Sequence, residues 1–203
     1  MKKQAIGGAL LCLSLMAANL EAAPAARGTL DIAGLITTTG LGDSDLYDFG
    51  AGVEAQVRFW LSENFGWAGV LGLSQWEASS SSSQWGGPIE GEMRFLPVGA
   101  SLIYRTSSEP GIRLVLEAGL RYAFVSSDVD LLVNGEKNSV SIENGVLGVV
   151  AADLERNVGG GQLFAGVAYQ LDLQAPDASW SGGDLRENSL EAASLRLGFR
   201  RPF

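Results

Sequence analysis

Apolar and polar side chains alternate along most of this chain, with the period of two that is typical of a β-strand. The segment 47–61 shows the pattern most clearly, because one face is apolar and the other carries polar residues or glycine. Comparable segments follow one another at 29–38, 47–61, 65–76, 90–105, 112–125, 142–155, 161–173 and 190–203. Eight strands, each with an apolar and a polar face, predict an all-β fold: an eight-stranded antiparallel up-and-down transmembrane β-barrel.

The phase of the alternation changes within the fourth segment. Val98 and Leu102 belong to its apolar face, but Met93 and Phe95 continue that face only if the strand gains one residue near Pro97. A β-bulge would absorb this residue, and proline is tolerated at bulges. We therefore expect a bulge near Pro97, with Met93 and Phe95 facing lipid.

The connections between the segments alternate in length. Those at 61–64, 106–111 and 156–160 are short, whereas those at 39–46, 77–89, 126–141 and 174–189 are mostly longer. Short periplasmic turns and long outer loops are typical of bacterial outer-membrane barrels, so both termini are expected at the periplasmic end. The pair Asn134-Gly135 between valine-rich arms predicts a hairpin that extends past the membrane.

The N-terminus has the features of a secretion signal. Lys2 and Lys3 precede an apolar stretch at 6–17 that is short for a membrane span, and small residues follow. We expect a signal peptide at 1–22 and a barrel domain at 23–203, with cleavage after Ala25 as the alternative. Cys12 is the only cysteine, so a mature chain would have no disulfide bond.

The charge of the chain is acidic, with 14 Lys and Arg residues against 23 Asp and Glu residues and a net charge of −9. Nucleic-acid binding requires a basic surface, so we expect no nucleic-acid partner. The chain is also too hydrophobic for a disordered protein of this charge.

Charged residues lie on the polar faces of several segments, where they would point into the barrel. An eight-stranded barrel leaves room for side chains only, and buried charges must pair. We therefore predict an ion-pair network that plugs the lumen, formed by Glu54, Arg58, Glu117, Arg121, Asp153, Glu155, Asp172, Arg196 and Arg200. A narrow or gated pore is the alternative.

Candidate catalytic residues are scarce, because the chain contains no histidine. Activation of serine or water at neutral pH most often uses imidazole. We expect no enzyme activity and no cofactor. The acidic pairs Asp43 with Asp45 and Asp128 with Asp130 are interpreted as solvated loops, because calcium needs about six oxygen ligands in a defined arrangement, so we expect no metal site.

Two tryptophans stand alone in Ser- and Gly-rich loops expected to face outward, Trp85 and Trp180. Indole rings can serve as binding platforms for a sugar or a partner surface. The alternative is that each ring folds down and caps the barrel mouth.

The last strand alternates up to the C-terminal residue, with Leu195, Leu197, Phe199 and Phe203 on one face. With the signal peptide and eight alternating segments, it resembles the small eight-stranded outer-membrane β-barrel superfamily. In that family the last strand, ending in an aromatic residue, is the signal read by the barrel-assembly machinery. We expect a monomer in outer-membrane lipid.

Three roles remain open from the sequence. The first is structural or surface-interactive, in envelope integrity or adhesion. The second is a narrow channel for ions or small solutes, and the third is a soluble periplasmic lipocalin-like ligand carrier. Membrane fractionation separates the third role from the others, and conductance separates the second.

Overall fold

The structure is a computed structural model that describes residues 27–38, 47–80, 87–106, 111–185 and 189–203. Within these ranges, the structure has no helix long and apolar enough to cross a membrane. The described strands are β1 (Arg27–Thr38), β2 (Tyr47–Trp60), β3 (Phe65–Ser80), β4 (Ile89–Arg105), β5 (Ile112–Val133), β6 (Glu136–Ile142), β7 (Gly145–Val158), β8 (Gly161–Gln174), β9 (Ala178–Trp180), β10 (Gly183–Leu185) and β11 (Ala192–Pro202).

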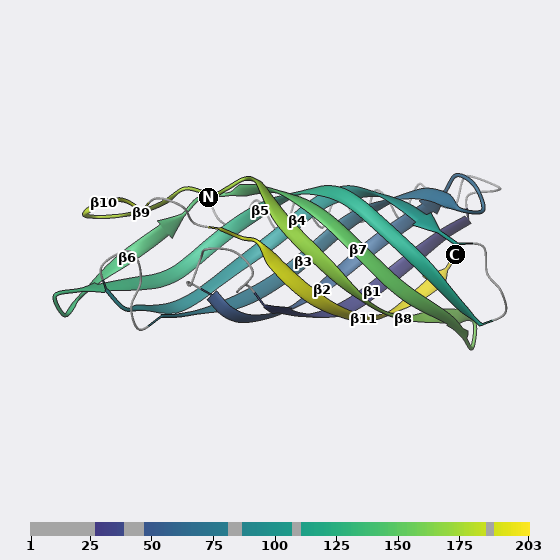
Figure 1. Cartoon of the computed structure of the whole chain (residues 1–203), viewed down its shortest axis with the longest axis horizontal. Helices are drawn as coiled ribbons and strands as arrows, with labels where there is room; N and C mark the ends of the chain where they lie inside the picture. Colours follow the sequence, from purple (N-terminus) through teal and green to yellow (C-terminus); the bar gives the residue numbers. More distant parts are fainter. Residues whose placement is uncertain (1–26, 39–46, 81–86, 107–110, 186–188) are drawn as a thin grey trace.

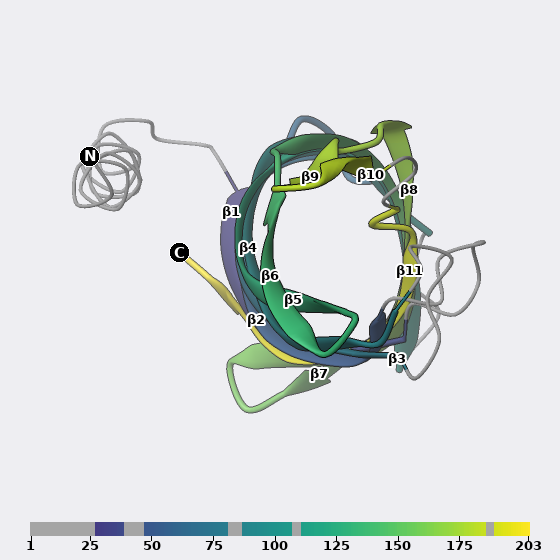
Figure 2. The ribbon, with the colours of Figure 1, turned by 90° about the vertical axis from the view of Figure 1, so that its left-hand side faces the viewer.

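Eight of these strands form a closed antiparallel barrel. Sequential neighbours pair from β1 to β5, β5 pairs β7, β7 pairs β8, β8 pairs β11, and β11 returns to β1. Figure 2 looks along the barrel and shows the resulting ring. The expected eight-stranded up-and-down barrel is therefore confirmed.

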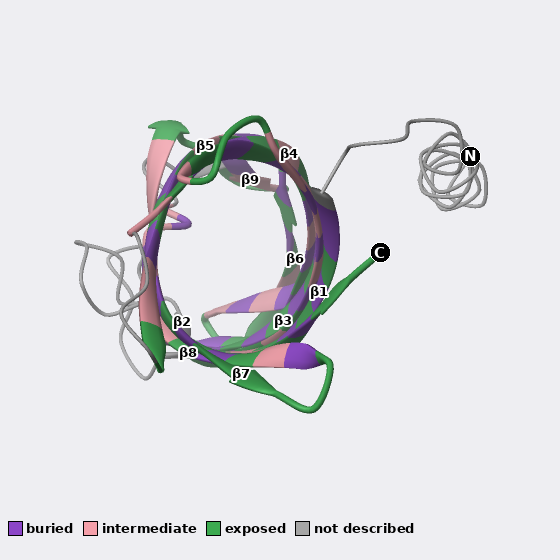
Figure 3. Ribbon diagram, turned by 90° about the vertical axis from the view of Figure 1, so that its right-hand side faces the viewer, coloured by how far each residue is buried: buried purple, intermediate pink, exposed green. Residues whose placement is uncertain are grey.

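The outside of the barrel is apolar. Val53 and Leu120 are 57% and 59% exposed, whereas their strand neighbours Glu54 and Arg121 are 3% and 5% exposed. Figure 3 shows this alternation of exposed and buried residues around the ring. The outward residues form an apolar belt that includes Leu30, Ile32, Ile36, Val53, Leu73, Leu102, Leu116, Leu120, Phe124, Val150, Leu154, Val167, Leu195 and Leu197. Such a belt is stable against lipid hydrocarbon and unfavourable in water.

The bulge expected near Pro97 is wrong. Burial alternates without a break along β4, and Met93 and Phe95 point inward with 0% and 3% exposure. The register of β3 against β4 is the same on both sides of Pro97, with Leu71 opposite Val98 and Ser74 opposite Phe95. The apolar residues change from the outer to the inner face because the barrel interior itself is apolar at this height.

The strands continue beyond the membrane at one end of the barrel. A strand needs about 9–11 residues to cross a bilayer, and β5 has 22. Its upper end forms the expected hairpin with β6, through Asn134 and Gly135 with φ of 53° and 83°, values that suit a tight type I′ turn. β6 pairs β9, and β9 pairs β10 (Figure 1).

These upper parts, residues 75–80, 89–94, 126–142 and 178–185, are called the outer extension below. Much of what the sequence predicts as long loops is therefore strand. In Figure 1 the outer extension and the C-terminus lie at opposite ends of the barrel. This arrangement agrees with a C-terminus at the periplasmic end.

Candidate functional site

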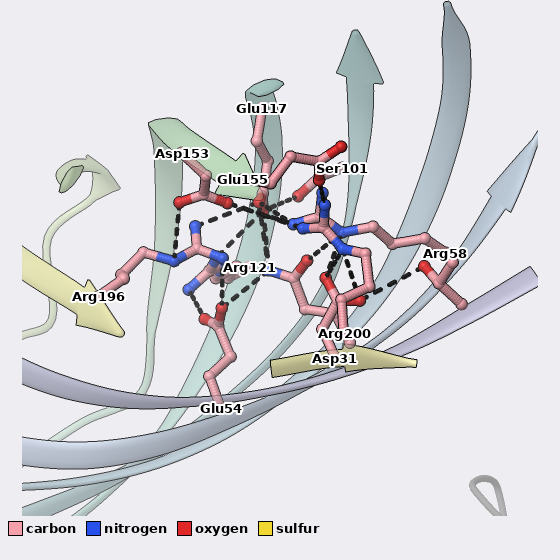
Figure 4. A network of polar contacts seen from close by, with 12 residues as sticks. Asp31, Glu54, Arg58, Ser101, Glu117, Arg121, Asp153, Glu155, Arg196 and Arg200 are labelled. Carbon is pink, nitrogen blue, oxygen red and sulfur yellow. Dashed lines mark hydrogen bonds and ion pairs between the residues drawn. The ribbon is translucent and has the colours of Figure 1, made fainter. Parts of the chain in front are cut away.

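The half of the barrel lumen that lies toward the C-terminus holds a layer of buried charges, called the charged layer below (Figure 4). Arg58 on β2 is fully buried, and its Nε lies 2.7 Å from Asp31 Oδ2 and donates a hydrogen bond of 2.9 Å to Gln56 Oε1. Its Nη2 lies 3.5 Å from Asp153 Oδ2, across the lumen on β7. The guanidinium of Arg58 therefore ties β1, β2 and β7 together.

A second part of the layer centres on Glu117 of β5, which is 4% exposed. Arg121 Nη2 and Arg196 Nη1 lie 3.3 and 3.2 Å from its two carboxylate oxygens, and Ser101 Oγ lies 2.9 Å away. Glu54 receives the other ends of the same arginines, at 2.5 Å from Arg121 and 3.2 Å from Arg196. Arg121 and Arg196 thus each bridge the carboxylates of Glu54 and Glu117.

Arg200 of β11 completes the charged layer. Its Nε lies 2.9 Å from both oxygens of Asp31, and its Nη1 pairs with Glu155 of β7. The ring of Phe164 lies 5.0 Å from the Arg200 guanidinium, a cation–π contact. In total, four arginines meet five carboxylates here, and pairing of this kind is what makes buried charge tolerable.

The outer half of the lumen is apolar instead. Trp76 and Phe95 pack edge to face with ring centroids 4.6 Å apart. They belong to an apolar cluster formed by Trp76, Ala78, Ile89, Met93, Phe95, Ala123, Val129, Leu131, Val140, Ile142, Leu147, Ala178, Leu190 and Ala192. The lumen therefore has two different fillings, charged toward the C-terminal end and apolar toward the outer extension.

A small cavity lies where the two layers meet. Its volume is about 20 Å³, and Glu54, Arg121, Arg196, Phe95 and Val149 are among its lining residues. A cavity of this size accommodates about one water molecule.

Eight of the nine lumen residues predicted from the sequence lie in the charged layer: Glu54, Arg58, Glu117, Arg121, Asp153, Glu155, Arg196 and Arg200. Asp172 differs, since its Oδ2 accepts hydrogen bonds from Ser189 Oγ at 2.8 Å and Leu190 N at 2.9 Å. Asp172 fixes the chain that leads into β11 and does not belong to the charged layer.

Sequence reasoning missed three polar members of this layer: Asp31, Gln56 and Ser101. Their signal was available, because each alternates with outward apolar residues, as Asp31 does between Leu30 and Ile32. The apolar cluster was also missed. In this cluster the inward residues are apolar and their outward neighbours are polar, as in Glu92, Met93 and Arg94. The lower parts of the strands have the opposite pattern, with polar residues inward and apolar residues outward.

Three residues of the predicted assembly signal lie on the outer face of β11, and the fourth, Phe203, directly follows this strand. Leu195, Leu197, Phe199 and Phe203 are 62%, 66%, 42% and 53% exposed. The Phe203 ring lies where a side chain of Gly28 would stand, and the Phe203 N–H donates to Gly28 O at 3.1 Å. The terminal aromatic residue therefore caps the end of β1.

Of the two tryptophans proposed as surface platforms, Trp180 lies within the described residues. Trp180 of β9 is partly buried and packs against the apolar cluster. This position corresponds to the alternative in which the ring covers the barrel mouth. Trp85 lies outside the described residues.

The outward face of the outer extension is acidic. Glu77 of β3, Glu92 of β4 and Asp128 of β5 stand opposite one another across neighbouring strands and are exposed. Lys137 of β6 pairs with Glu90, and the hydrogen bond to that carboxylate raises the pKa of Lys137 above its ordinary value. The polar surface shows that this part of the wall stands in water, beyond the apolar belt.

Comparison with known proteins adds the fold family. No protein-family model and no curated protein matches the chain. Among solved structures, OprG from Pseudomonas aeruginosa superposes with a TM-score of 0.62 at 14% identity, over 88% of this chain and 96% of OprG. The chain has the fold of the small eight-stranded outer-membrane β-barrels.

Two further outer-membrane barrels share this fold. The Neisserial surface protein A matches with a TM-score of 0.54 at 16% identity, over 88% of this chain and 97% of that protein. A major outer membrane protein from Thermus thermophilus matches with a TM-score of 0.54 at 13% identity, over 87% of this chain and 99% of that protein. Outer-membrane localisation, expected from the sequence, is the location that this fold and the apolar belt support.

Proposed function

We propose that this outer-membrane barrel carries no solute flux, and that it works through its wall and its outer extension, in envelope integrity or in contact with other surfaces. Lipid surrounds the apolar belt. The barrel-assembly machinery inserts a monomer by reading Leu195, Leu197, Phe199 and Phe203. A soluble lipocalin-like carrier does not fit, because such a barrel would keep large apolar side chains inside and not on its surface.

The observation that supports a closed lumen is that two layers of side chains fill it, the apolar cluster and the charged layer. An ion moving from the outer side would first meet the apolar cluster, where a hydrophobic constriction excludes water and opposes conduction. It would then meet the charged layer, in which Arg58 is fully buried and bound to carboxylates on β1 and β7. The cavity between the layers is only about 20 Å³.

Single-channel recording in planar bilayers tests the closed lumen. The purified full chain is expected to give no discrete conductance steps in concentrated KCl. A matched variant, Trp76→Ala with Arg121→Ala, shortens one side chain in each layer and is expected to produce steps. Stable, reproducible steps from the unaltered protein would instead support the narrow-channel alternative.

The outer extension supports the surface role. It raises β3, β4, β5 and β6 above the apolar belt as one continuous hydrogen-bonded sheet, which is more rigid than loops of the same length. Shortening the β5–β6 hairpin, by joining 129 to 140 through Asn-Gly, removes the tip and leaves the belt intact. Cells carrying this variant are expected to keep the barrel in the outer membrane but to lose adherence or detergent resistance. If neither property changes, the surface role of the tip is wrong.

A further inference from the structure

The seam of the barrel is the contact between its first and last strands, β1 and β11. It joins Asp31 to Arg200, which are 169 residues apart in the chain. The contacts that close so long a loop form late in folding. They must be more favourable in one alignment of β1 and β11 than in the other alignments. We propose that Asp31 sets the register in which β11 closes the barrel against β1.

Asp31 is the meeting point of two arginines from the two strands that flank β1. Arg200 of β11 stands directly opposite, with its Nε 2.9 Å from each carboxylate oxygen of Asp31. Arg58 of β2 approaches from the other side, at 2.7 Å. Asp31 is 1% exposed, so water cannot replace these partners.

The apolar belt does not select the register. A slip by one residue would turn every side chain of β11 to the wrong face, but a slip by two keeps apolar residues outside. In one slip Ile32 and Ile36 would stand opposite Leu197 and Ala193, and in the other opposite Arg201 and Leu197, so the apolar residues of both strands stay on the outer face. Contact with lipid is nearly the same in each case.

The charged layer does distinguish these registers. In one slip by two, Asp31 would face Gly198, over which the Phe164 ring lies. In the other slip, Asp31 would face Pro202 at the end of β11. Neither arrangement places a cation of β11 opposite Asp31, so Asp31 would keep Arg58 alone. Removing one partner from a buried ion pair is strongly unfavourable. Fixing register is the best-attested role of buried polar groups.

Among the described residues, one other pair of polar side chains crosses the seam inside the barrel, the hydroxyls of Thr37 and Ser194 at 2.9 Å. This pair favours the same register but more weakly. A neutral hydroxyl can bind a water molecule, and Thr37 and Ser194 both line the small cavity that has room for one. The carboxylate of Asp31 has no comparable substitute.

Cysteine cross-linking reads the register directly, in the full chain with Cys12→Ser as background. Ile36→Cys with Leu195→Cys reports the observed register, because these residues stand opposite each other. Ile36→Cys with Ala193→Cys, or with Leu197→Cys, reports the two slips. The Cα atoms of directly opposed residues lie within disulfide range. The Cα atoms of residues displaced by two positions along the strand lie about 7–8 Å apart, which is beyond that range.

With Asp31 intact, only the Leu195 reporter is expected to cross-link when barrels inserted in membranes are treated with a permeant oxidant. With Asp31→Asn added, at least one slip reporter is expected to cross-link with a yield comparable to the Leu195 reporter. Arg121→Gln is the control, since it removes a buried charge of β5 whose ion pairs are with Glu54 of β2 and Glu117 of β5 and not with a seam strand. It is expected to give the Leu195 cross-link alone. The same result from Asp31→Asn would overturn the proposal.

A transposed carboxylate covers the case in which Asp31→Asn does not fold. Thr29→Asp combined with Asp31→Thr keeps the total lumen charge, and position 29 is inward and opposite Arg58. Pairing this carboxylate with Arg200 requires the slip reported by Ala193. The expected result is a gain of the Ala193 cross-link. Cross-linking at Leu195 alone would contradict the proposal.

Discussion

At the scale of single residues, the surroundings of each charge decide what it contributes. Arg58 and Arg94 are both arginines on barrel strands, but the side chain of Arg58 is 0% exposed and that of Arg94 is 63% exposed. Arg58 pairs with carboxylates from three other strands, whereas Arg94 pairs with Glu92 two residues away on its own strand. The two residues therefore form a matched pair for mutation.

Arg58→Ala is expected to lower the free energy of unfolding by about 3–5 kcal/mol, because it removes a fully buried cation that Asp31 and Asp153 share and leaves Asp31 with Arg200 alone. Arg94→Ala is expected to lower it by less than about 1 kcal/mol, since water screens the exposed pair. Urea titration of the folded barrel in lipid vesicles, followed by tryptophan fluorescence, measures both changes. Equal losses for the two variants would contradict the ion-pair role assigned to Arg58.

At the scale of elements, the β5–β6 hairpin shows how a local signal can set a long-range feature. Asn134 and Gly135 have positive φ, a conformation that glycine and asparagine adopt with little strain. The turn reverses the chain so that Val129 meets Val140, and both are buried in the apolar cluster. Two turn residues thus help to form the apolar cluster.

Gly135→Val is expected to loosen this hairpin without unfolding the barrel, because a β-branched residue strongly disfavours positive φ. Hydrogen exchange at β6 amides should become faster, while the heat-modifiable migration of the barrel on gels stays unchanged. Ser139→Val on β6 is the control, since Ser139 is exposed and has no positive φ. Unchanged exchange in Gly135→Val would show that the turn conformation does not limit the hairpin.

The sequence predicts well wherever one face of a strand is apolar and the other is polar. Glu54, Glu117 and Arg121 were placed inward on that basis, and the structure agrees. The rule fails for Met93 and Phe95 because it equates apolar with lipid-facing, whereas the outer lumen is apolar too. Which charges meet across the lumen depends on strand order and stagger, which one sequence does not specify.

At the scale of the whole molecule, the apolar belt defines how much of the barrel stands in the membrane. On β5 the outward face is apolar at Leu120, Tyr122 and Phe124 and becomes polar at Ser126 and Asp128. The same change occurs on β4 between Val98 and Arg94. The outer boundary of the hydrocarbon region therefore crosses β5 near residue 125.

Leu120→Arg and Ser126→Arg test that boundary with the same substitution on one face of one strand. An arginine facing lipid near the bilayer centre costs about 2–4 kcal/mol, and the cost falls to about 0–1 near the interface. Leu120→Arg is expected to reduce the free energy of folding into vesicles by the larger amount and Ser126→Arg by the smaller. Similar effects at both positions would place the belt elsewhere.

The outer extension is not evenly distributed around the ring. Strands β3, β4 and β5 rise beyond the belt and continue into β6 and β9, whereas β1 ends at Thr38 and β11 begins at Ala192. The described part of the molecule, round within the bilayer, is thus one-sided above it. Neighbours diffusing in the membrane plane meet the acidic outer extension from one direction, which gives the barrel a defined orientation toward whatever lies beside it.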